Sequence, residues 1–488
     1  MERAEAPSYK IATALFLRLT AACFLCAFVS LWVQVDGLIG SSGILPVSRF
    51  LAAAREALGP ERFRLLPTLC WLGSSDAALH ALCGAGAIVS VLALAGAAPA
   101  LCLFLAWALY LSLCVAGQVF FEFQWDFLLL ETGLLAVLLA APRLSPRAAR
   151  AAPISGFALF LLRFLLFRLN LSSGLVKLES GDRTWRNLSA LSHHYETQPL
   201  APWTAWYFHQ LPASFHVASC VILFAVELAV PFFVFGPARV RRLAGAALAG
   251  LQILIAVSGN YAFFNILTLA LCVLCFDDAL FPERLRARAP AEAGRGWPRW
   301  VVWPSGGVLL FAASVHLATL VPGLPLPRPI VALVNVLAPF RSANGYGLFA
   351  VMTTERPEIV VEGSEDGQTW KPYEFRWKPG DVTRRPRFVA PHQPRLDWQM
   401  WFAALGSYEQ QPWFLGFCAR LLQGSPSVTA LLAKDPFPGA PPRYLRAVVY
   451  DYRFTSRAER RATGAWWTRE EKGLYLPVLS KDMLREAR

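Results

Sequence analysis

Charged residues are scarce in this chain. Asp, Glu, Lys and Arg together make up 16% of its 488 residues, whereas hydrophobic residues make up 56%. A soluble domain commonly carries about 25% charged residues, so the composition excludes an ordinary soluble protein. The apolar residues gather in long runs, and an α-helix needs about 20 such residues to cross a bilayer. The sequence therefore predicts a polytopic α-helical membrane protein.

The common catalytic and ligand-binding signatures are also missing. The sequence contains no GxSxG element of serine hydrolases, no HExxH helix and no glycine-rich loop set between a strand and a helix. His193, His194, His209 and His216 lie close together in sequence, but Glu196 is the one carboxylate near ligand spacing. We therefore expect no metal site and no cofactor, and we assign no catalytic residue.

Most of the ten cysteines lie within apolar runs and are predicted to be small core residues. Cys23 and Cys26 have CxxC spacing, but they lie in mid-helix without a second CxxC or a flanking His. Cys70 and Cys418 fall outside the apolar runs. They are the one pair that we expect to be accessible and that a disulfide could join.

Nine apolar runs are candidate spanning helices: 11–33, 77–97, 100–120, 126–141, 154–175, 213–236, 243–259, 261–276 and 301–321. The runs 126–141 and 261–276 are short for a full crossing. Basic residues outnumber acidic ones by 46 to 33 and lie mostly in loops between these runs. The loops at 143–150, 239–242 and 284–299 share the side of the N-terminus, which the positive-inside rule makes cytoplasmic. Because these charges orient the chain in a membrane, we expect no nucleic-acid partner.

The remaining segments divide the chain into three parts. Residues 1–321 form a membrane domain with outer loops at 34–76 and 178–212, residues 322–340 a proline-rich linker, and residues 341–488 an extracytoplasmic domain. The first loop contains an amphipathic run, 47–58, that is predicted to lie along the membrane surface. The second loop is rich in Trp, Tyr and Phe, as interfacial segments are.

Alternating patterns predict that the C-terminal domain is β-rich. The segments 358–362 and 370–377 flank an Asp-Gly turn of the kind that favours hairpins, and 445–454 is a further strong strand. We expect a small, sandwich-like sheet that packs on helices at 398–406 and 411–422.

Five ionisable residues lie within or beside apolar runs, where charges are costly and are usually paired or functional. They are Glu122, Asp126, Glu131, Arg163 and Arg168. Glu122 and Asp126 are four residues apart and would share a helix face. The two arginines, both in the fifth predicted span, are the nearest cationic candidates within a span. We expect buried or interfacial ion pairs that fix helix packing, with a substrate or proton pathway as the alternative.

The segment 174–198 gathers charged and aromatic residues at the outer end of the fifth predicted span. Lys177 lies beside Glu179 and Asp182. A desolvated lysine could act as a base, but acidic neighbours favour a protonated lysine that reaches the membrane interface, which is the role we expect. Asn187 begins an Asn-x-Ser sequon on the outer side and is a candidate glycosylation site.

Several long motifs together resemble the lipase maturation factor family. They are VDGLIGSSGILP, GQVFFEFQWDFLLLETG, RFLLFRLNLSSGLVKLESGDRTW, LSHHYETQPLAPWTAWYFHQLP, GNYAFFNILTL, LRAVVYDYRF and GAWWTRE. The resemblance runs nearly end to end. It implies a multi-pass protein of the endoplasmic reticulum membrane, with a lumenal C-terminal domain, that helps secreted homodimeric lipases to fold and assemble. The candidate functional residues within these motifs are Lys177, Asp182, Trp185, His193, His194, Tyr195, Glu196 and Gln198.

Two alternatives remain open at this point. The membrane part is also similar to the vitamin K-dependent carboxylase membrane domain, in which a lysine in a GxxKL setting serves in base chemistry, and Lys177 in SGLVKL falls at the matching place. That similarity implies an integral membrane enzyme acting on a quinone-like or lipid substrate. The arginine-rich composition also permits a bacterial homologue in the inner membrane, with a periplasmic domain and other clients.

Over both alternatives we favour the hypothesis that the resemblance to lipase maturation factors implies, a maturation factor that acts without catalysis. Its partners would be immature secreted lipases or other secretory clients, together with membrane lipids. Folding intermediates expose edge strands and apolar faces that aggregate readily, so shielding them is a sufficient task for an outer domain.

Overall fold

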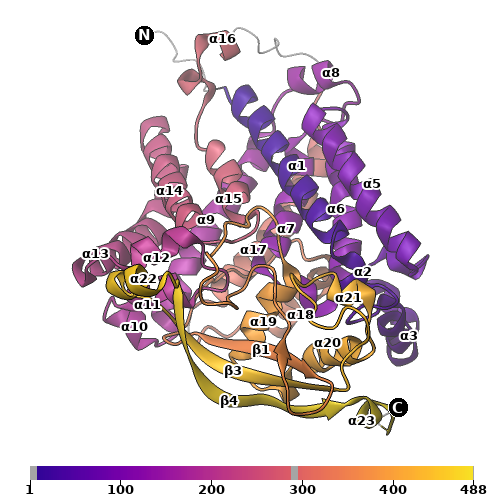
Figure 1. Ribbon diagram of the computed structural model, residues 1–488. Helices are drawn as coiled ribbons and strands as arrows, with labels where there is room; N and C mark the ends of the chain where they lie inside the picture. The colour runs from indigo at the N-terminus through magenta and orange to yellow at the C-terminus, as the bar shows by residue number, and fades with distance from the viewer. Residues whose placement is uncertain (1–7, 287–294, 322, 487–488) are drawn as a thin grey trace, which may run out of the picture.

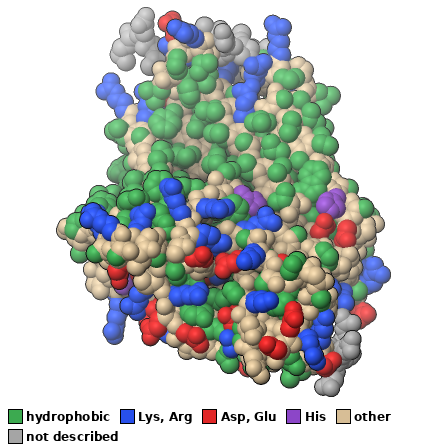
Figure 2. All heavy atoms as spheres, in the orientation of Figure 1, with side chains coloured by type: hydrophobic (Ala, Val, Ile, Leu, Met, Phe, Trp, Pro, Cys, Tyr) green, Lys and Arg blue, Asp and Glu red, His purple; other side chains and the backbone are tan. Residues whose placement is uncertain are grey.

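The computed structural model describes residues 8–286, 295–321 and 323–486. A bundle of long helices forms one part, and an antiparallel sheet with short helices forms a second part at one end of the bundle (Figure 1). On the face that Figure 2 shows, the surface of the bundle is largely hydrophobic, whereas acidic and basic side chains mingle over the part that contains the sheet. The uncharged surface belongs to the part that the sequence assigns to the bilayer.

Seven helical segments are long and apolar enough to cross a membrane. They are α1 (Lys10–Trp32), α5 (Asp76–Ala95), α6 (Pro99–Ala116), α9 (Gly156–Glu179), α13 with the turns that follow it (Ala213–Phe235), α14 (Ala238–Ser258) and α17 (Arg299–Ala318). The two short predicted spans correspond to α7 (Gln124–Leu139) and α15 (Phe264–Val273). Both are mostly buried in the bundle, so neighbouring helices cover them in place of lipid.

The described parts of the basic loops lie together at the end of the bundle opposite the sheet. This end carries the start of α1, α8 (Pro146–Ala151) and α16 (Glu283–Arg286) (Figure 1). At this end Asp278 accepts hydrogen bonds from the Ser8 hydroxyl and the Lys10 amide, both at 2.7 Å, and so holds the start of α1 in place. The structure thus places these loops on one side, as the charge pattern predicts.

Shorter helices form the two outer loops and the remainder of the chain. Loop 34–76 contains α2 (Val35–Ile39), α3 (Val47–Leu58) and α4 (Arg62–Leu65), and loop 178–212 contains α10 (Arg183–Arg186), α11 (Ala190–Thr197) and α12 (Trp203–His209). After α17 come α18 (Arg328–Leu337), α19 (Arg395–Ala404), α20 (Pro412–Leu422), α21 (Pro426–Thr429), α22 (Arg457–Thr463) and α23 (Lys481–Glu486).

The sheet has four antiparallel strands in the order β2-β1-β3-β4. Their bounds are β1 Pro357–Ser364, β2 Lys371–Pro372, β3 Tyr444–Phe454 and β4 Trp467–Ser480. Helices α19 and α20 pack against it, so within the described residues the layer facing this sheet is helical and not the second sheet of a sandwich. The apolar face of a sheet must be covered by some layer, and these two helices provide it.

The cysteines differ from expectation at one point. Cys70 and Cys418 are 2% and 0% exposed, respectively, and neither forms a disulfide. Cys418 lies on the buried face of α20, and burial raises the pKa of its thiol. The predicted accessibility of this pair is therefore wrong, because the short turn that carries Cys70 and the inner face of α20 that carries Cys418 both pack into the core.

Candidate functional site

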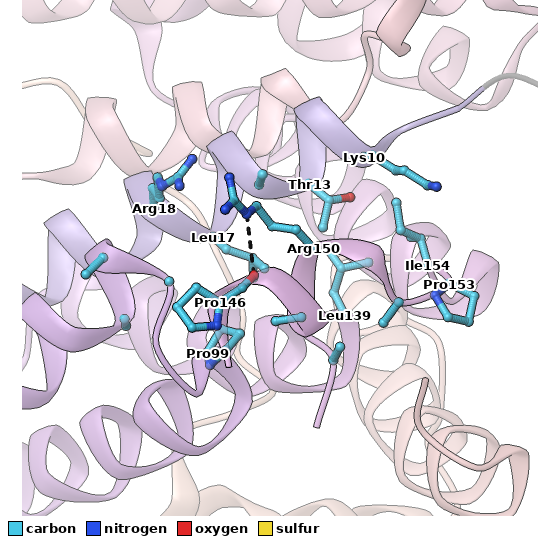
Figure 3. A pocket seen from close by; sticks show the side chains of 17 residues that line it. Lys10, Thr13, Leu17, Arg18, Pro99, Leu139, Pro146, Arg150, Pro153 and Ile154 are labelled. Carbon is cyan, nitrogen blue, oxygen red and sulfur yellow. Dashed lines mark hydrogen bonds between the residues drawn. The ribbon is translucent and has the colours of Figure 1, made fainter. Parts of the chain in front are cut away.

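The cavity that the candidate motif residues line, called the main cavity below for that reason, lies where α9, α13 and α14 meet loop 178–212. Its volume is about 330 Å³, and most of its wall is apolar. The candidate residues Lys177, Trp185, His194 and Tyr195 all line it, although they come from three different helices. A smaller cavity of about 70 Å³, beside α1 and α8, is shown in Figure 3. It has room for roughly two waters and is too small for an organic ligand.

Lys177 forms a buried ion pair that the sequence analysis did not identify. Its Nζ lies 2.8 Å from Glu227 Oε2 and 3.1 Å from Oε1, and it donates a third hydrogen bond to the Ser173 carbonyl at 2.8 Å. The side chains of the pair are 5% and 8% exposed. Glu179, the neighbour in sequence, is instead exposed. The three donors of an ammonium group are thus all directed at acceptors.

The local backbone brings Glu227 to this position. The regular helix α13 (Ala213–Phe224) gives way to a wide turn at Ala225–Ala229 and then to a 3-10 turn that contains Pro231. Proline has no N–H group to continue the helix, and wide turns of this type often occur at functional sites. Gly174 permits the close approach, because a Cβ there would lie 3.1 Å from the Glu227 Cβ and 2.6 Å from the Leu228 side chain.

The sequence feature that could have indicated a role for Glu227 is that it is the one acid in the apolar run 213–235. Ionisable residues within membrane segments usually have a partner and a purpose. Lys177 and Glu227 are 50 residues apart, so local sequence patterns do not indicate that they pair.

A chain of hydrogen bonds next to the cavity fixes the orientation of Gln198. Its Nε2 donates to the Ser258 carbonyl at 2.7 Å and to the Tyr195 carbonyl at 3.2 Å. Its Oε1 must therefore accept the hydrogen of the Tyr261 hydroxyl, which lies 3.0 Å away. The Tyr261 oxygen is then left to accept from a further donor.

That donor is Nε2 of His194, at 3.1 Å from the Tyr261 oxygen. Burial, assisted by the positive charge of Lys177, lowers the pKa of His194 to about 4, so the imidazole is neutral at neutral pH. A neutral ring that carries its hydrogen on Nε2 has an acceptor at Nδ1. Among the described residues this buried Nδ1 has no hydrogen-bond partner.

The other motif residues support the surrounding structure. Asp182 accepts hydrogen bonds from the Thr184 hydroxyl at 2.7 Å and from the Met352 amide at 2.7 Å, which attaches the segment before the sheet to α10. Glu196 accepts from the Phe454 amide at 2.8 Å. His193 is not part of the cavity wall.

Arg356 joins loop 178–212 to the sheet. It donates to the carbonyls of Glu196, Gln198 and Pro199, and its guanidinium pairs with Glu358 at 2.8 Å. Lys378 contacts Glu358 from the other side at 2.9 Å. All three charged side chains of this cluster are nearly inaccessible to solvent.

Three of the five ionisable residues singled out within or beside the apolar runs take part in two further ion pairs. Arg168, one of the two arginines named as candidate partners of the acids, pairs with Glu131, and the Tyr346 hydroxyl also donates to Glu131 at 2.7 Å. Arg163 instead donates to the Leu274 carbonyl at 3.0 and 2.8 Å. Glu122 is exposed, because α7 begins only at Gln124 and no shared helix turn joins it to Asp126.

Asp126 finds its partner in the C-terminal part of the chain. Arg395, the first residue of α19, donates to both of its carboxylate oxygens at 2.9 Å. The same guanidinium donates to the Phe120 carbonyl at 2.6 Å and lies 3.6 Å from the centre of the Phe121 ring. Both charged side chains are 0% exposed. This pair therefore attaches the sheet and its helices directly to the bundle.

Comparison with known proteins accounts for both parts of this arrangement. Residues 11–283 match the lipase maturation factor transmembrane domain, and residues 342–477 match the lipase maturation factor C-terminal domain. The chain belongs to the lipase maturation factor family. The Arg395–Asp126 pair thus joins the two domains by which this family is defined.

Relatives of both named types align with nearly the whole chain. Lipase maturation factor 2 of Gallus gallus is 38% identical, over 96% of this chain and 81% of its own length. Lipase maturation factor 1 of Homo sapiens is 35% identical, over 96% and 88%, and that of Bos taurus is 34% identical, over 99% and 91%. No solved structure matches the chain.

Proposed function

We propose that this member of the lipase maturation factor family assists the folding and assembly of secreted lipases at the endoplasmic reticulum membrane, with its sheet in the lumen. The relatives named lipase maturation factors and the two matching domains support this function. The basic loops opposite the sheet support the orientation, because such loops favour the cytoplasmic side. A client bound to the sheet of this multi-pass protein would be held beside the bilayer.

The observation that carries the proposal is the free edge of β4. This strand of 14 residues is last in the order of the sheet, and within residues 8–286, 295–321 and 323–486 it pairs with β3 along one edge and with no strand along the other. It runs along the side of the sheet region farthest from the basic loops (Figure 1). An unpaired strand edge offers a row of N–H and C=O groups to an extended segment of another chain. Leu474 and Val478, at 62% and 42% exposure, add apolar contacts along this strand.

The composition of β4 suits transient binding. The segment 469–472 reads Arg-Glu-Glu-Lys, and Pro477 and a left-handed Gly473 interrupt the regular edge. Such features discourage two copies of a strand from pairing permanently. An edge of this kind captures an immature client and still releases it when the client completes its own sheet.

The experiment replaces Leu474 and Val478 together with Lys. We expect roughly a tenfold loss of co-purified lipase, because the two side chains lose apolar contact with the client, and a matching fall in secreted lipase activity. Leu405→Lys, at a residue of 45% exposure beyond the end of α19, is the matched control and leaves capture unchanged. Equal capture by the double variant and wild type, at equal protein levels, would refute the role of β4.

A further inference from the structure

We propose that the main cavity binds an uncharged membrane lipid that carries a free hydroxyl group, drawn laterally from the bilayer. This site is separate from the β4 edge and does not depend on the identity of any client. Four observations support it: where the cavity opens, how large it is, what charge its wall carries and which polar group in its wall lacks a partner.

The cavity is bordered by side chains that face outward from the bundle. Phe215 and Ile222 of α13 are 38% and 59% exposed, and Leu254 of α14 is 58% exposed, yet all three line the cavity. Both helices belong to the candidate spans, so these exposed apolar surfaces lie at the depth of the bilayer. A molecule that enters between them comes from the lipid phase.

The volume and lining suit a hydrocarbon chain. About 330 Å³ lies within the range of roughly 300–1,000 Å³ that ligand sites commonly occupy. Water in so apolar a space would lack most of its hydrogen bonds, since a buried water typically needs two to four polar partners. An acyl chain needs none and fills the space with dispersion contacts.

The wall of the cavity carries no net charge. Lys177 is balanced by Glu227, which occupies two of its three donors, and His194 is neutral. Apart from these, the ionisable residues of the wall are the two phenols of Tyr195 and Tyr261. A phosphate group would therefore be buried without a counter-charge, which is costly. This excludes a phospholipid headgroup and leaves an uncharged one.

One nitrogen of His194, a residue of the cavity wall, has no hydrogen-bond donor among the described residues. Nδ1 of His194 is buried and accepts no hydrogen bond from any described residue, and the order of hydrogen bonds through Tyr261 and Gln198 makes it an acceptor. An unsatisfied buried acceptor is unfavourable, and a lipid hydroxyl supplies the missing hydrogen once the side chains that cover Nδ1 in this structure move aside. Because His194 belongs to α11 in the outer loop, the headgroup lies at the interface and the chain extends between α13 and α14.

The test places the full-length protein in phosphatidylcholine vesicles with a photoreactive lipid. The probes are a diacylglycerol with a diazirine on its acyl chain, the same molecule with its hydroxyl acetylated, and phosphatidylcholine with the same diazirine chain. We expect the diacylglycerol probe to label peptides of the cavity wall in α9 and α14. Both other probes should label only the outward surface of the bundle. Equal labelling of the wall by the phosphatidylcholine probe, or by the acetylated probe, would overturn the proposal.

A matched pair of variants locates the site. Ile222→Trp places a bulky ring at the border of the cavity, whereas Val221→Trp changes an adjacent residue of α13 that is 51% exposed and does not line it. Each methylene kept out of the cavity costs roughly a fourfold loss of affinity, so exclusion of two or more predicts at least about a tenfold loss of wall labelling with Ile222→Trp. Val221→Trp should label as wild type does. The same labelling in both variants would contradict this site, and the comparison of probes on the wild-type protein decides the question if either variant fails to fold.

Discussion

Replacing Arg395 with Met is expected to lower the free energy of unfolding by about 3–5 kcal/mol and to detach the sheet and its helices from the bundle. The Asp126 carboxylate would then remain buried with its negative charge uncompensated. It would keep the Tyr110 hydroxyl as a donor but lose both bonds from the guanidinium. The Phe120 carbonyl would lose its donor as well. Thermal unfolding of the purified protein in detergent, with limited proteolysis between residues 322 and 357, measures both effects.

The double variant Arg395→Met with Asp126→Leu separates the charge effect from lost packing. Replacing both members of a buried ion pair with apolar side chains is often neutral, whereas removing one member is not. We therefore expect the double variant to recover most of the lost stability and the protease resistance. A double variant as unstable as Arg395→Met would show that the loss comes from the missing contacts of Arg395 with Phe120 and Phe121, and not from an uncompensated charge on Asp126.

Replacing Lys177 with Met should have an effect of similar size, again about 3–5 kcal/mol, because Glu227 would be left charged at 8% exposure inside the bundle. The variant should reach the membrane at reduced levels and yield less secreted lipase. Quantitative immunoblotting of the membrane fraction and a lipase assay of the medium measure these two quantities.

Adding Glu227→Leu to Lys177→Met tests whether the lysine has a chemical role. A lysine that only balances a buried charge is no longer needed once the acid is gone, so protein level and lipase secretion should recover together. A lysine that acts as a base cannot be replaced in this way. Recovered protein with lipase secretion still absent would favour the enzymatic alternative and contradict the structural role.

The membrane helices could be predicted because hydropathy is a local property of the sequence. Each long span lies close to its predicted limits, and α7 and α15 are the two predicted to be short. Strands β1 and β3 were equally evident from their alternation. Most of the predicted strand 370–377 is not a strand, because β2 pairs with β1 through Lys371 and Pro372 only.

The edge strand β4 was harder to find. Its residues 469–472 are all charged, and Gly473 and Pro477 interrupt any alternation of polar and apolar residues. Most side chains of this edge strand are exposed to solvent, so no buried face requires an alternation of polar and apolar residues. The feature on which the proposed function depends is therefore one that sequence patterns conceal.

Ion pairs between distant segments could not be predicted from one sequence. Asp126 and Arg395 are 269 residues apart, and the nearest arginines within a predicted span, Arg163 and Arg168, were the natural but incomplete choice. Lys177 likewise pairs with Glu227 and not with its acidic neighbours in sequence. In each case the partner is set by which helices pack together, which local patterns do not encode.

The most direct test of the central claim is photocrosslinking in sealed microsomes from cells that secrete a lipase. A photoreactive phenylalanine analogue is placed at Leu474 of β4 or, for comparison, at Leu405. If β4 presents its edge to immature lipases in the lumen, the position 474 probe captures the lipase inside intact vesicles and the position 405 probe does not. Capture of cytosolic proteins by the position 474 probe, or of the lipase by position 405 alone, would contradict this account.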